Sequence, residues 1–409
     1  MTHSPPDHRP AVTVLSGFSP TATSAVAHRL LSEDPNLLLV VHTLDDLADG
    51  RVRRLVRTAA GVVEDVTVEL VHGCVSCTLR EDVLPTLVRL ARTHPQSDQL
   101  LALPRAVEPE AVASACAHTL LDGRPVTDAV RFDSYVTVVD VDTVLDGLDT
   151  TDDLRDRGLH AAPDDHRAVA DVVARQIEYA DTLVSWARPE SDPLERVRVA
   201  TLLRRLAPWA VQLDADAPDV PAALRRTGRH DPQKPGTLGR GQEGYPIGEH
   251  DPTPDWGVTA MLFEARRPFH PQRLHDALEE LAGRTLRARG QLWIASQPDT
   301  ALGFEAAGGG IGLGSLGYWL AALPPREWDD ASPSRRLTAD ATWDPYYGDR
   351  RTQLAFVGLD SAPDALTTIL AECLLTDDEL ADGWDAWSAL PDPFAGCFAL
   401  PEPTTGTAP

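Results

Sequence analysis

The chain has 409 residues, enough for two or three domains with separate cores, and 43% of its residues are hydrophobic. Its formal net charge of −25 argues against broad electrostatic binding of DNA or RNA, which requires a basic surface. No apolar run approaches the roughly 18 residues of a membrane span, and residues 1–10 lack the features of a secretory signal. We therefore expect a cytoplasmic protein with no membrane contact.

The first half of the chain alternates short apolar runs with segments of helical period. The expected strands are residues 11–16, 37–42, 62–70, 99–103, 133–141, 181–185 and 210–213. The expected helices are residues 22–32, 80–92, 109–121, 165–179 and 194–206. Such alternation is typical of βαβ units, so the sequence predicts an α/β domain over residues 11–213, a mainly parallel sheet with helices on both faces.

Residues 214–255 interrupt this pattern because they are rich in Pro, Gly and Asp, and we expect an exposed linker there. Beyond it the expected elements are strands at 257–264, near 291–296 and at 353–359, a helix from Pro271, a glycine-rich hairpin at 303–318, and helices at 362–373 and 376–387. This mixture predicts a smaller α+β domain over residues 256–397. Residues 398–409 are expected to form a disordered tail.

The segment VTVLSGFSPTATSAVAHRLL (12–31) has the strand–turn–helix order of a phosphate-binding loop. Such a loop reads GxxxxGK[ST], and its backbone N–H groups and lysine hold the phosphates. The corresponding positions here are Gly17, Ala22, Thr23 and Ser24. Pro20 removes a backbone donor, and the one lysine of the chain is Lys234. We therefore interpret the segment as a degenerate loop, and expect neither GTP nor magnesium as a cofactor.

A thiol pair lies in ELVHGCVSCTLRED (69–82), at the end of an expected strand and before a helix. Cys74 and Cys77 would provide half of a tetrahedral zinc site, with Glu69, His72 or a distant histidine completing it. The alternatives are a redox dithiol and two unrelated thiols. The five cysteines are too few for a disulfide scaffold, and their odd number favours a reducing compartment.

Other candidates have simpler structural explanations. His270 and His275 flank an expected helix start, where capping or packing is the commoner role of histidine. The stretch GDRR (348–351) is typical of a solvated turn, and the glycines of residues 306–317 are typical of a hairpin. No Ser/His/Asp spacing indicates a hydrolase, so no catalytic residue is predicted.

Taken together, these segments resemble the CobW-like family, a branch of the P-loop GTPases linked to the handling of zinc and other metals. In the first domain the resemblance is carried by VTVLSGF, ELVHGCVSCTLREDVLPTLVRLA and VARQIEYADTLV. In the second domain it is carried by FEARRPFHPQRLHDAL, RARGQLWIASQPD and GDRRTQLAFVGLD. It covers nearly the whole chain and implies a GTPase-like domain followed by the family's α+β domain.

The chain departs from the family pattern at the thiols and at three nucleotide-contacting motifs. Ser76 replaces the middle cysteine of the family's CxCC. The glycine and lysine of the phosphate loop align with Ala22 and Thr23. The acidic residue and glycine of the next motif align with Ala102 and Arg105. The guanine-reading Asn-Lys-x-Asp aligns with residues 186–189, which are Trp, Ala, Arg and Pro. Proline cannot hold the guanine edge as aspartate does. The resemblance therefore implies a pseudo-GTPase, which is not an enzyme.

Within the family, the thiol segment is most similar to that of an actinobacterial branch that recruits a hibernation factor to ribosomes under zinc limitation. The resemblance implies a zinc-responsive adaptor whose partners are the small ribosomal subunit, the hibernation factor, or both. The alternative is a divergent GTP-binding zinc metallochaperone, which Ser24 and the strand–turn–helix keep open. A protein-binding module indifferent to metal is a third possibility.

Overall fold

In the computed structural model, the described residues are 7–162, 165–249 and 253–398. The chain divides into two compact units, one ending at Lys234 and the other beginning at Pro235. None of the helices in the described ranges is both long and apolar enough to cross a membrane.

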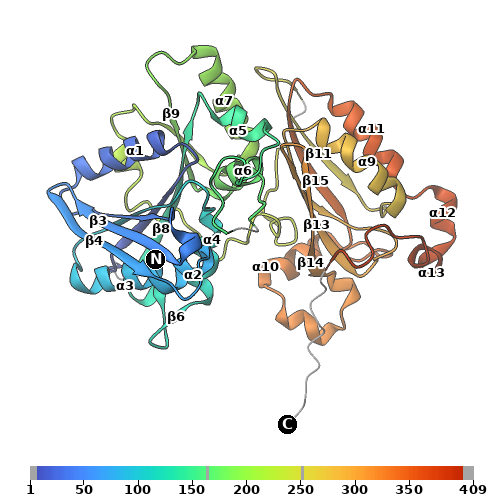
Figure 1. Cartoon of the computed structure of the whole chain (residues 1–409). Helices are drawn as coiled ribbons and strands as arrows, with labels where there is room; N and C mark the ends of the chain where they lie inside the picture. Colours follow the sequence, from blue (N-terminus) through green and yellow to red (C-terminus); the bar gives the residue numbers. More distant parts are fainter. Residues whose placement is uncertain (1–6, 163–164, 250–252, 399–409) are drawn as a thin grey trace, which may run out of the picture. The chain divides into compact units, whose positions relative to one another are not determined.

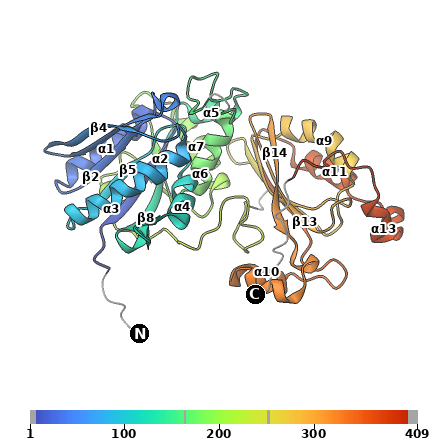
Figure 2. The same ribbon diagram turned by 60° about the horizontal axis from the view of Figure 1, so that its bottom comes forward.

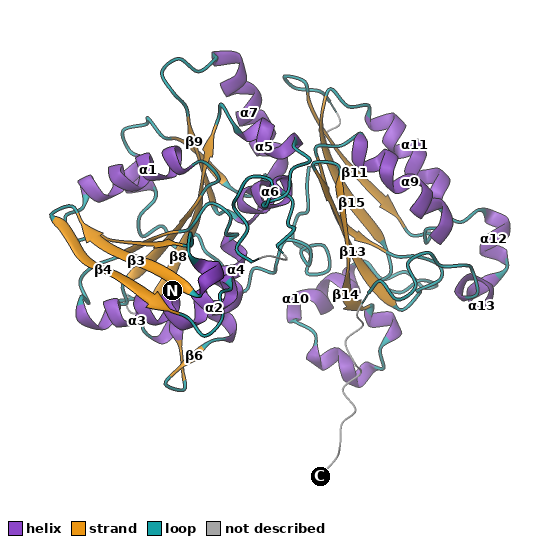
Figure 3. Ribbon diagram, viewed as in Figure 1, coloured by secondary structure: helices purple, strands orange, loops and turns teal. Residues whose placement is uncertain are grey.

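The first unit is built on an eight-stranded sheet with the order β10-β9-β8-β1-β5-β2-β3-β4 (Figures 1 and 3). The strands are β1 (Ala11–Ser16), β2 (Leu38–Thr43), β3 (Arg51–Thr58), β4 (Gly61–Glu69), β5 (Gln99–Ala102), β8 (Arg131–Asp140), β9 (Thr182–Trp186) and β10 (Val211–Asp214). Strands β10 to β2 are parallel, and β3 and β4 join antiparallel at one edge. The predicted α/β fold is confirmed.

Helices cover both faces of this sheet, because its strands bury alternate side chains on opposite sides. The longer helices are α1 (Pro20–Glu33), α3 (Leu84–Thr93), α4 (Pro109–His118), α6 (Val169–Tyr179) and α7 (Pro193–Leu206). Shorter elements are η1 (Leu47–Asp49), α2 (Val75–Thr78), the π-helical η2 (Leu79–Val83), β6 (Leu120–Leu121), β7 (Arg124–Pro125), η3 (Val126–Asp128), α5 (Val144–Asp149) and α8 (Val220–Ala223).

Strand β3 was not predicted. Its sequence RVRRLVRT buries only Val52 and Val56, and the arginines between them obscure the period of two that marks a strand. It pairs with both β2 and β4, so the expected single edge strand is half of a hairpin.

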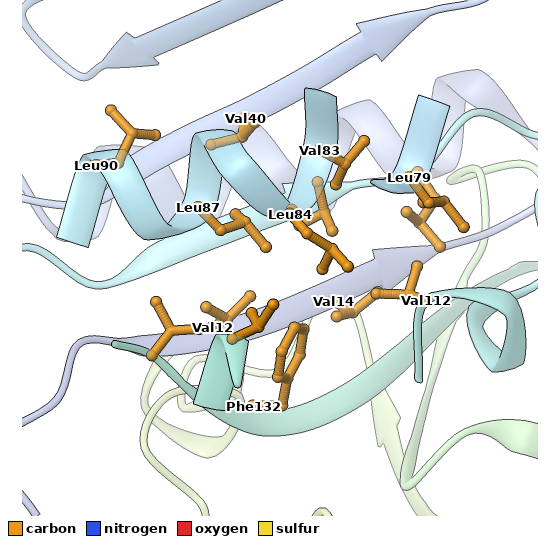
Figure 4. Close-up of a cluster of buried hydrophobic side chains, with 14 of the residues drawn as sticks. Val12, Val14, Val40, Leu79, Val83, Leu84, Leu87, Leu90, Val112 and Phe132 are labelled. Carbon is orange, nitrogen blue, oxygen red and sulfur yellow. The ribbon is translucent and has the colours of Figure 1, made fainter. Parts of the chain in front are cut away.

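The helical stretch from α2 through η2 to α3 is anchored on the sheet by one apolar face. Leu79, Val83, Leu84, Leu87 and Leu90 are buried in one cluster, three or four residues apart for the most part. Figure 4 shows these side chains turned toward others from β1, β2, β8 and α4, namely Val12, Val14, Val40, Val112 and Phe132. This packing fixes the position of the two thiols at the start of the stretch.

The expectation of an exposed linker over residues 214–255 is wrong for its described part. Val220 and Leu224 are buried against α1 and the sheet. Arg226 forms an ion pair with Asp98 at 2.7 Å, and the Lys234 ammonium donates to the Asp181 carboxylate at 3.0 Å. Proline and glycine prevent long helices or strands here, but they do not prevent the side chains between them from packing.

The second unit contains a five-stranded antiparallel sheet with the order β11-β15-β12-β13-β14. The strands are β11 (Val258–Ala265), β12 (Arg287–Leu292), β13 (Thr300–Ala307), β14 (Gly310–Tyr318) and β15 (Thr352–Leu359). Helices α9 (Pro271–Gly283) and α11 (Pro363–Cys373) lie side by side and pack on it (Figures 1 and 2). The remaining elements are η4 (Leu320–Ala322), η5 (Pro325–Asp330), α10 (Pro333–Ala341), α12 (Asp377–Ala381) and α13 (Gly383–Ser388).

Three predictions in this unit need correction. The strand expected near 291–296 is β12, which ends at Leu292. Helix α10 was not predicted, and the helix expected at 376–387 is broken at Asp382 into α12 and α13. Of the expected disordered tail, Phe398 stacks on Phe394, and the other residues lie outside the described ranges.

Candidate functional site

The turn between β1 and α1 is shorter than a phosphate-binding loop. Strand β1 ends at Ser16 and α1 begins at Pro20, so residues 17–19 alone connect them. In a phosphate-binding loop the residues between the two glycines form the loop whose N–H groups hold the phosphates. Here α1 already begins at Pro20, between the two glycine positions 17 and 22.

Two backbone donors at the start of α1 are bound by Ser19. The Ser19 hydroxyl caps α1 by accepting from the Ala22 N–H at 3.4 Å, and it donates to the Asp140 carboxylate at 2.7 Å. The Ser19 carbonyl accepts from both the N–H and the hydroxyl of Thr23, at 3.0 and 2.9 Å. Because Pro20 has no N–H, three of the first four residues of α1 offer no free N–H to a phosphate.

Thr23, at the position of the motif lysine, is buried against Gly17. A Cβ placed on Gly17 would lie 2.5 Å from the Thr23 hydroxyl and 2.6 Å from the Val138 carbonyl. The glycine is therefore needed for close packing of the turn on the strand and the helix. The predicted loop residues Gly17, Ala22, Thr23 and Ser24 thus lie in a plain capped helix start.

The other two nucleotide motifs also have different partners here. Arg105 follows β5, and its guanidinium lies over the Phe18 ring, 4.8 Å from the centroid. Arg188 follows β9 and donates to the Asp142 carboxylate at 3.0 Å. The segment that would read guanine therefore carries an arginine already bound to a carboxylate.

The two thiols of the predicted metal site lie together at the start of α2. Cys74 is the N-cap of this helix, and its sulfur accepts from the Cys77 N–H at 3.0 Å. The Cys74 side chain is half-buried and that of Cys77 is buried. Hydrogen bonding to Cys74 and burial raise the pKa of the Cys77 thiol.

The segment that leads to the thiols is pinned to the turn around η1. The Leu70 N–H donates to the Gly50 carbonyl at 2.8 Å. A Cβ on Gly73 would lie 2.0 Å from the Leu47 carbonyl, so only glycine permits this approach. The entry to the thiol pair is therefore fixed on one side by backbone packing.

Glu69 and His72 are exposed on this segment. Among residues 7–162, 165–249 and 253–398, no three His, Cys, Asp or Glu side chains lie together in a way that would hold a metal ion. The structure thus brings Cys74 and Cys77 together and does not gather Glu69 or His72 with them. The third and fourth metal ligands stay a prediction.

A buried polar network connects the thiol-bearing stretch to the sheet. His42 at the end of β2 contacts the Asp82 carboxylate through Nε2 at 2.8 Å, and both side chains are buried. The Arg54 guanidinium on β3 binds the other oxygen of the same carboxylate. Asp82 lies in η2, five positions after Cys77, so one carboxylate joins β2, β3 and the helix behind the thiols.

Next to this network lies a pocket of about 500 Å³ within the first unit. It is bounded by one flank of α1, the ends of β2 and β5, strand β3 and residues 158–161. Val75, between the two thiols, also lines it. Its polar lining residues include His28, His42, Asp45, Arg57, Arg105, His160 and Arg167.

Sequence reasoning missed this pocket and the network beside it. Arg105 attracted attention only as a departure from the family pattern, and Arg57 not at all. His42 and Asp82 are 40 positions apart, and no local signal pairs them. The one sequence feature that could have drawn attention to His42 is its position as a polar residue near the end of the apolar strand β2.

Comparison with known protein families gives two matches that together span most of the chain. The family described as CobW/HypB/UreG, nucleotide-binding domain, matches residues 23–186. The family described as cobalamin synthesis protein cobW C-terminal domain matches residues 258–374.

Comparison with individual proteins gives relatives along the whole chain. A zinc chaperone of Mycobacterium tuberculosis is 34% identical over 384 residues, which cover 89% of each chain. The zinc-regulated GTPase metalloprotein activator 1 of Dictyostelium discoideum is 29% identical over 408 residues, 94% of this chain and 83% of the relative. The Zn(II)-bound YjiA GTPase from E. coli aligns over 90% of this chain and 99% of its own, with 14% identity and a TM-score of 0.37.

Proposed function

The chain belongs to the CobW family, and from this membership we propose that it binds zinc through Cys74 and Cys77 and does not hydrolyse GTP. One observation carries the proposal. The thiol pair is held together on the anchored helix α2, whereas Ser19 occupies the N–H groups of Ala22 and Thr23 at the start of α1.

Zinc fits the donor chemistry of the thiol pair. Two cysteines separated by two residues are a common half of a tetrahedral zinc site, and zinc binds thiolates. The names of two relatives, a zinc chaperone and a zinc-regulated activator, support zinc as the metal. Because the pKa of Cys77 is raised, zinc has to displace a proton from it, and affinity will fall as pH falls.

A competition titration against a calibrated zinc chelator tests this site. We expect one-to-one binding by the reduced protein that is lost in the Cys74→Ser/Cys77→Ser variant. Cys116→Ser/Cys397→Ser is the matched control, because it removes two thiols from outside the segment and should leave zinc affinity unchanged. Equal, weak binding in all three proteins would refute the site.

At a finer level, we propose that the protein is a zinc-responsive adaptor that brings a hibernation factor to ribosomes. The similarity of its thiol segment to that of ribosome-associated members supports this role. Zinc would act by changing the arrangement, and hence the exposure to a partner, of residues 69–77.

Co-sedimentation with 30S subunits, with and without zinc chelation, tests the adaptor role. We expect the hibernation factor to sediment in a manner that depends on both this protein and zinc, and the Cys74→Ser/Cys77→Ser variant to lose the zinc dependence. The adaptor role is wrong if the factor sediments equally without this protein.

The alternative is a zinc metallochaperone that binds GTP without the motif lysine. Ser24 stands at the position of the magnesium-binding hydroxyl and lines the pocket, which favours this alternative. Titration with a fluorescent GTP analogue and magnesium separates the two. We expect no saturable binding at high micromolar concentration, and saturable binding would establish the alternative.

A further inference from the structure

The pocket of the first unit begins at the N-terminus of α1, where Gly17 lines it, and continues along one side of the helix. Its lining includes Pro20, Thr23, Ala27 and His28, which are three, four and one positions apart and therefore share one flank of the helix. A nucleotide in a phosphate loop places its phosphates at the helix N-terminus. The cavity therefore continues well past the place where a phosphate loop would act.

The lining of this pocket is cationic although the chain as a whole is strongly acidic. Three arginines line it, and among the described lining residues Asp45 is the one carboxylate. Arg167 is neutralised because it is bound by Glu108 and Asp165. This leaves two guanidiniums, those of Arg57 and Arg105, against the single carboxylate of Asp45 in the described lining.

Neither of these guanidiniums has a partner of opposite charge within the described ranges. The Nε atoms of Arg57 and Arg105 are buried and lack a hydrogen-bond acceptor. The contact of the Arg105 guanidinium is with the face of the Phe18 ring. Burial and the nearby Arg157 lower the pKa of Arg105. Both side chains are half-buried, and a guanidinium that lines a cavity without a carboxylate partner is free to bind an anion.

The rest of the lining is apolar and adds a second requirement. Leucine and valine side chains from β2, β3 and the loops after β5 and α5 face the cavity, together with alanines and a proline: Ala27, Leu39, Val41, Leu44, Leu55, Leu103, Pro104, Ala106 and Leu159. A volume of about 500 Å³ with mostly apolar walls and a few polar groups is typical of small-molecule sites.

We propose that this pocket binds a small organic anion, with its acidic group on Arg57 and Arg105 and its apolar body against α1, β2 and β3. The acidic group is a phosphate monoester or a carboxylate, because both accept two parallel hydrogen bonds from a guanidinium. The proposal does not depend on zinc binding. It goes beyond the family's nucleotide chemistry, since Arg57 is on β3 and Arg105 replaces the family's glycine.

Isothermal titration calorimetry with model anions tests the pocket. The probes are phenyl phosphate, benzoate, the neutral benzyl alcohol and Mg-GTP, each titrated into the full chain up to millimolar concentration. We expect one-to-one binding of at least one of the two aromatic anions and none of benzyl alcohol. The tighter of the two anions identifies the acidic group as phosphate or carboxylate.

Matched variants assign the binding to the two arginines. We expect Arg57→Gln and Arg105→Gln each to weaken anion binding at least about tenfold, because a hydrogen bond to a charged group is lost. Arg51→Gln is the control, since Arg51 is on the same strand but 47% exposed and pairs with Asp49. Circular dichroism verifies folding, and Arg57→Lys, which keeps the charge but loses the planar fork, serves if a glutamine variant does not fold.

Three results would overturn the proposal. These are no binding of either anion, equal binding by wild type and both arginine variants, or binding of Mg-GTP that Arg57→Gln abolishes. The last result would make the cavity a nucleotide site and would also refute the proposed loss of GTP binding. The zinc titration is a separate readout, so failure of the anion site leaves the thiol site standing.

Discussion

Asp82 provides the sharpest test of how the thiol-bearing helix is held. Its carboxylate is buried and contacts His42 and Arg54, from two different strands. Asp82→Asn keeps the shape of the side chain but removes the charge. Breaking a buried ion pair by removing one partner costs about 3–5 kcal/mol, and the lower end applies here because Arg54 keeps a second carboxylate, that of Glu64, at 3.4 Å.

The expected effect on thermal stability follows from the size of the unit. For 150–250 residues, 1 kcal/mol shifts the melting temperature by about 2–4 °C. The first unit ends at Lys234, so a loss of about 3 kcal/mol in Asp82→Asn should lower its transition by about 6 to 12 °C in differential scanning calorimetry. Alkylation of Cys77 by iodoacetamide should also become faster, because local opening of the helix exposes the buried thiol.

Asp65→Asn is the matched control. Asp65 makes two hydrogen bonds to Arg53 at 2.7 Å, but the side chains are 43% and 58% exposed. An exposed pair contributes at most about 1 kcal/mol, so this variant should melt within a few degrees of wild type. If the two variants lose the same stability, burial of the Asp82 network is not what holds the helix.

Three further predictions concern the same unit. Gly17→Ala should destabilise it by about 1–3 kcal/mol in urea melts, because the new Cβ would lie 2.6 Å from the Val138 carbonyl; an unchanged midpoint would contradict the packing argument. Burial lowers the pKa of His230 below its ordinary 6.5, so its contribution is present above pH 6.5 and lost as pH falls through the folded pKa. The free energy of unfolding, measured by urea melts, should fall less between neutral and acidic pH in His230→Gln than in wild type. If it falls equally in both proteins, His230 is not a cause of the pH dependence. Cys77 should react with iodoacetamide more slowly than the exposed Cys397 at neutral pH, because its pKa is raised and it is buried; mass spectrometry of labelled peptides measures the ratio, and equal rates would contradict it.

The alternation of elements made the fold of the first unit predictable, because strands buried on both faces are continuous apolar runs. Strands β1 (AVTVLS) and β2 (LLVVHT) contain such runs; they were expected at 11–16 and 37–42 and are observed at 11–16 and 38–43. Strand β3 was hidden by its four arginines, and the pairing of one of them, Arg53, with Asp65 on β4 is revealed only by the hairpin.

Burial of the Pro/Gly-rich segment depends on contacts that are distant in sequence. Lys234 reaches Asp181 and the Tyr179 carbonyl, more than 50 positions earlier. No composition or periodicity rule contains such a contact, so an irregular packed segment and a flexible linker look alike in sequence.

The thiol pair was predictable as a motif, since the spacing CxxC before a helix places two sulfurs on one helix start. The pocket was not, because its walls come from seven separate stretches between Gly17 and Arg167. A cavity of this kind has no sequence period. Its chemistry appears only when Arg57 and Arg105 are seen to lack the carboxylates that pair most other arginines of the unit.

Two residues connect the pocket with the thiol segment, and this connection has a thermodynamic consequence. Val75 lies between the thiols and lines the pocket, and His42 lines the pocket and binds Asp82 behind the thiols. If zinc rearranges this segment, it changes the pocket walls, and linkage then requires an anion to change zinc affinity by the same factor as zinc changes anion affinity. Zinc titrations with and without phenyl phosphate, and the reverse, measure both factors. We expect the two affinity factors to be equal, to have a value other than 1 in the wild type, and to be closer to 1 in Asp82→Asn. If both factors equal 1 in the wild type, the two sites are independent.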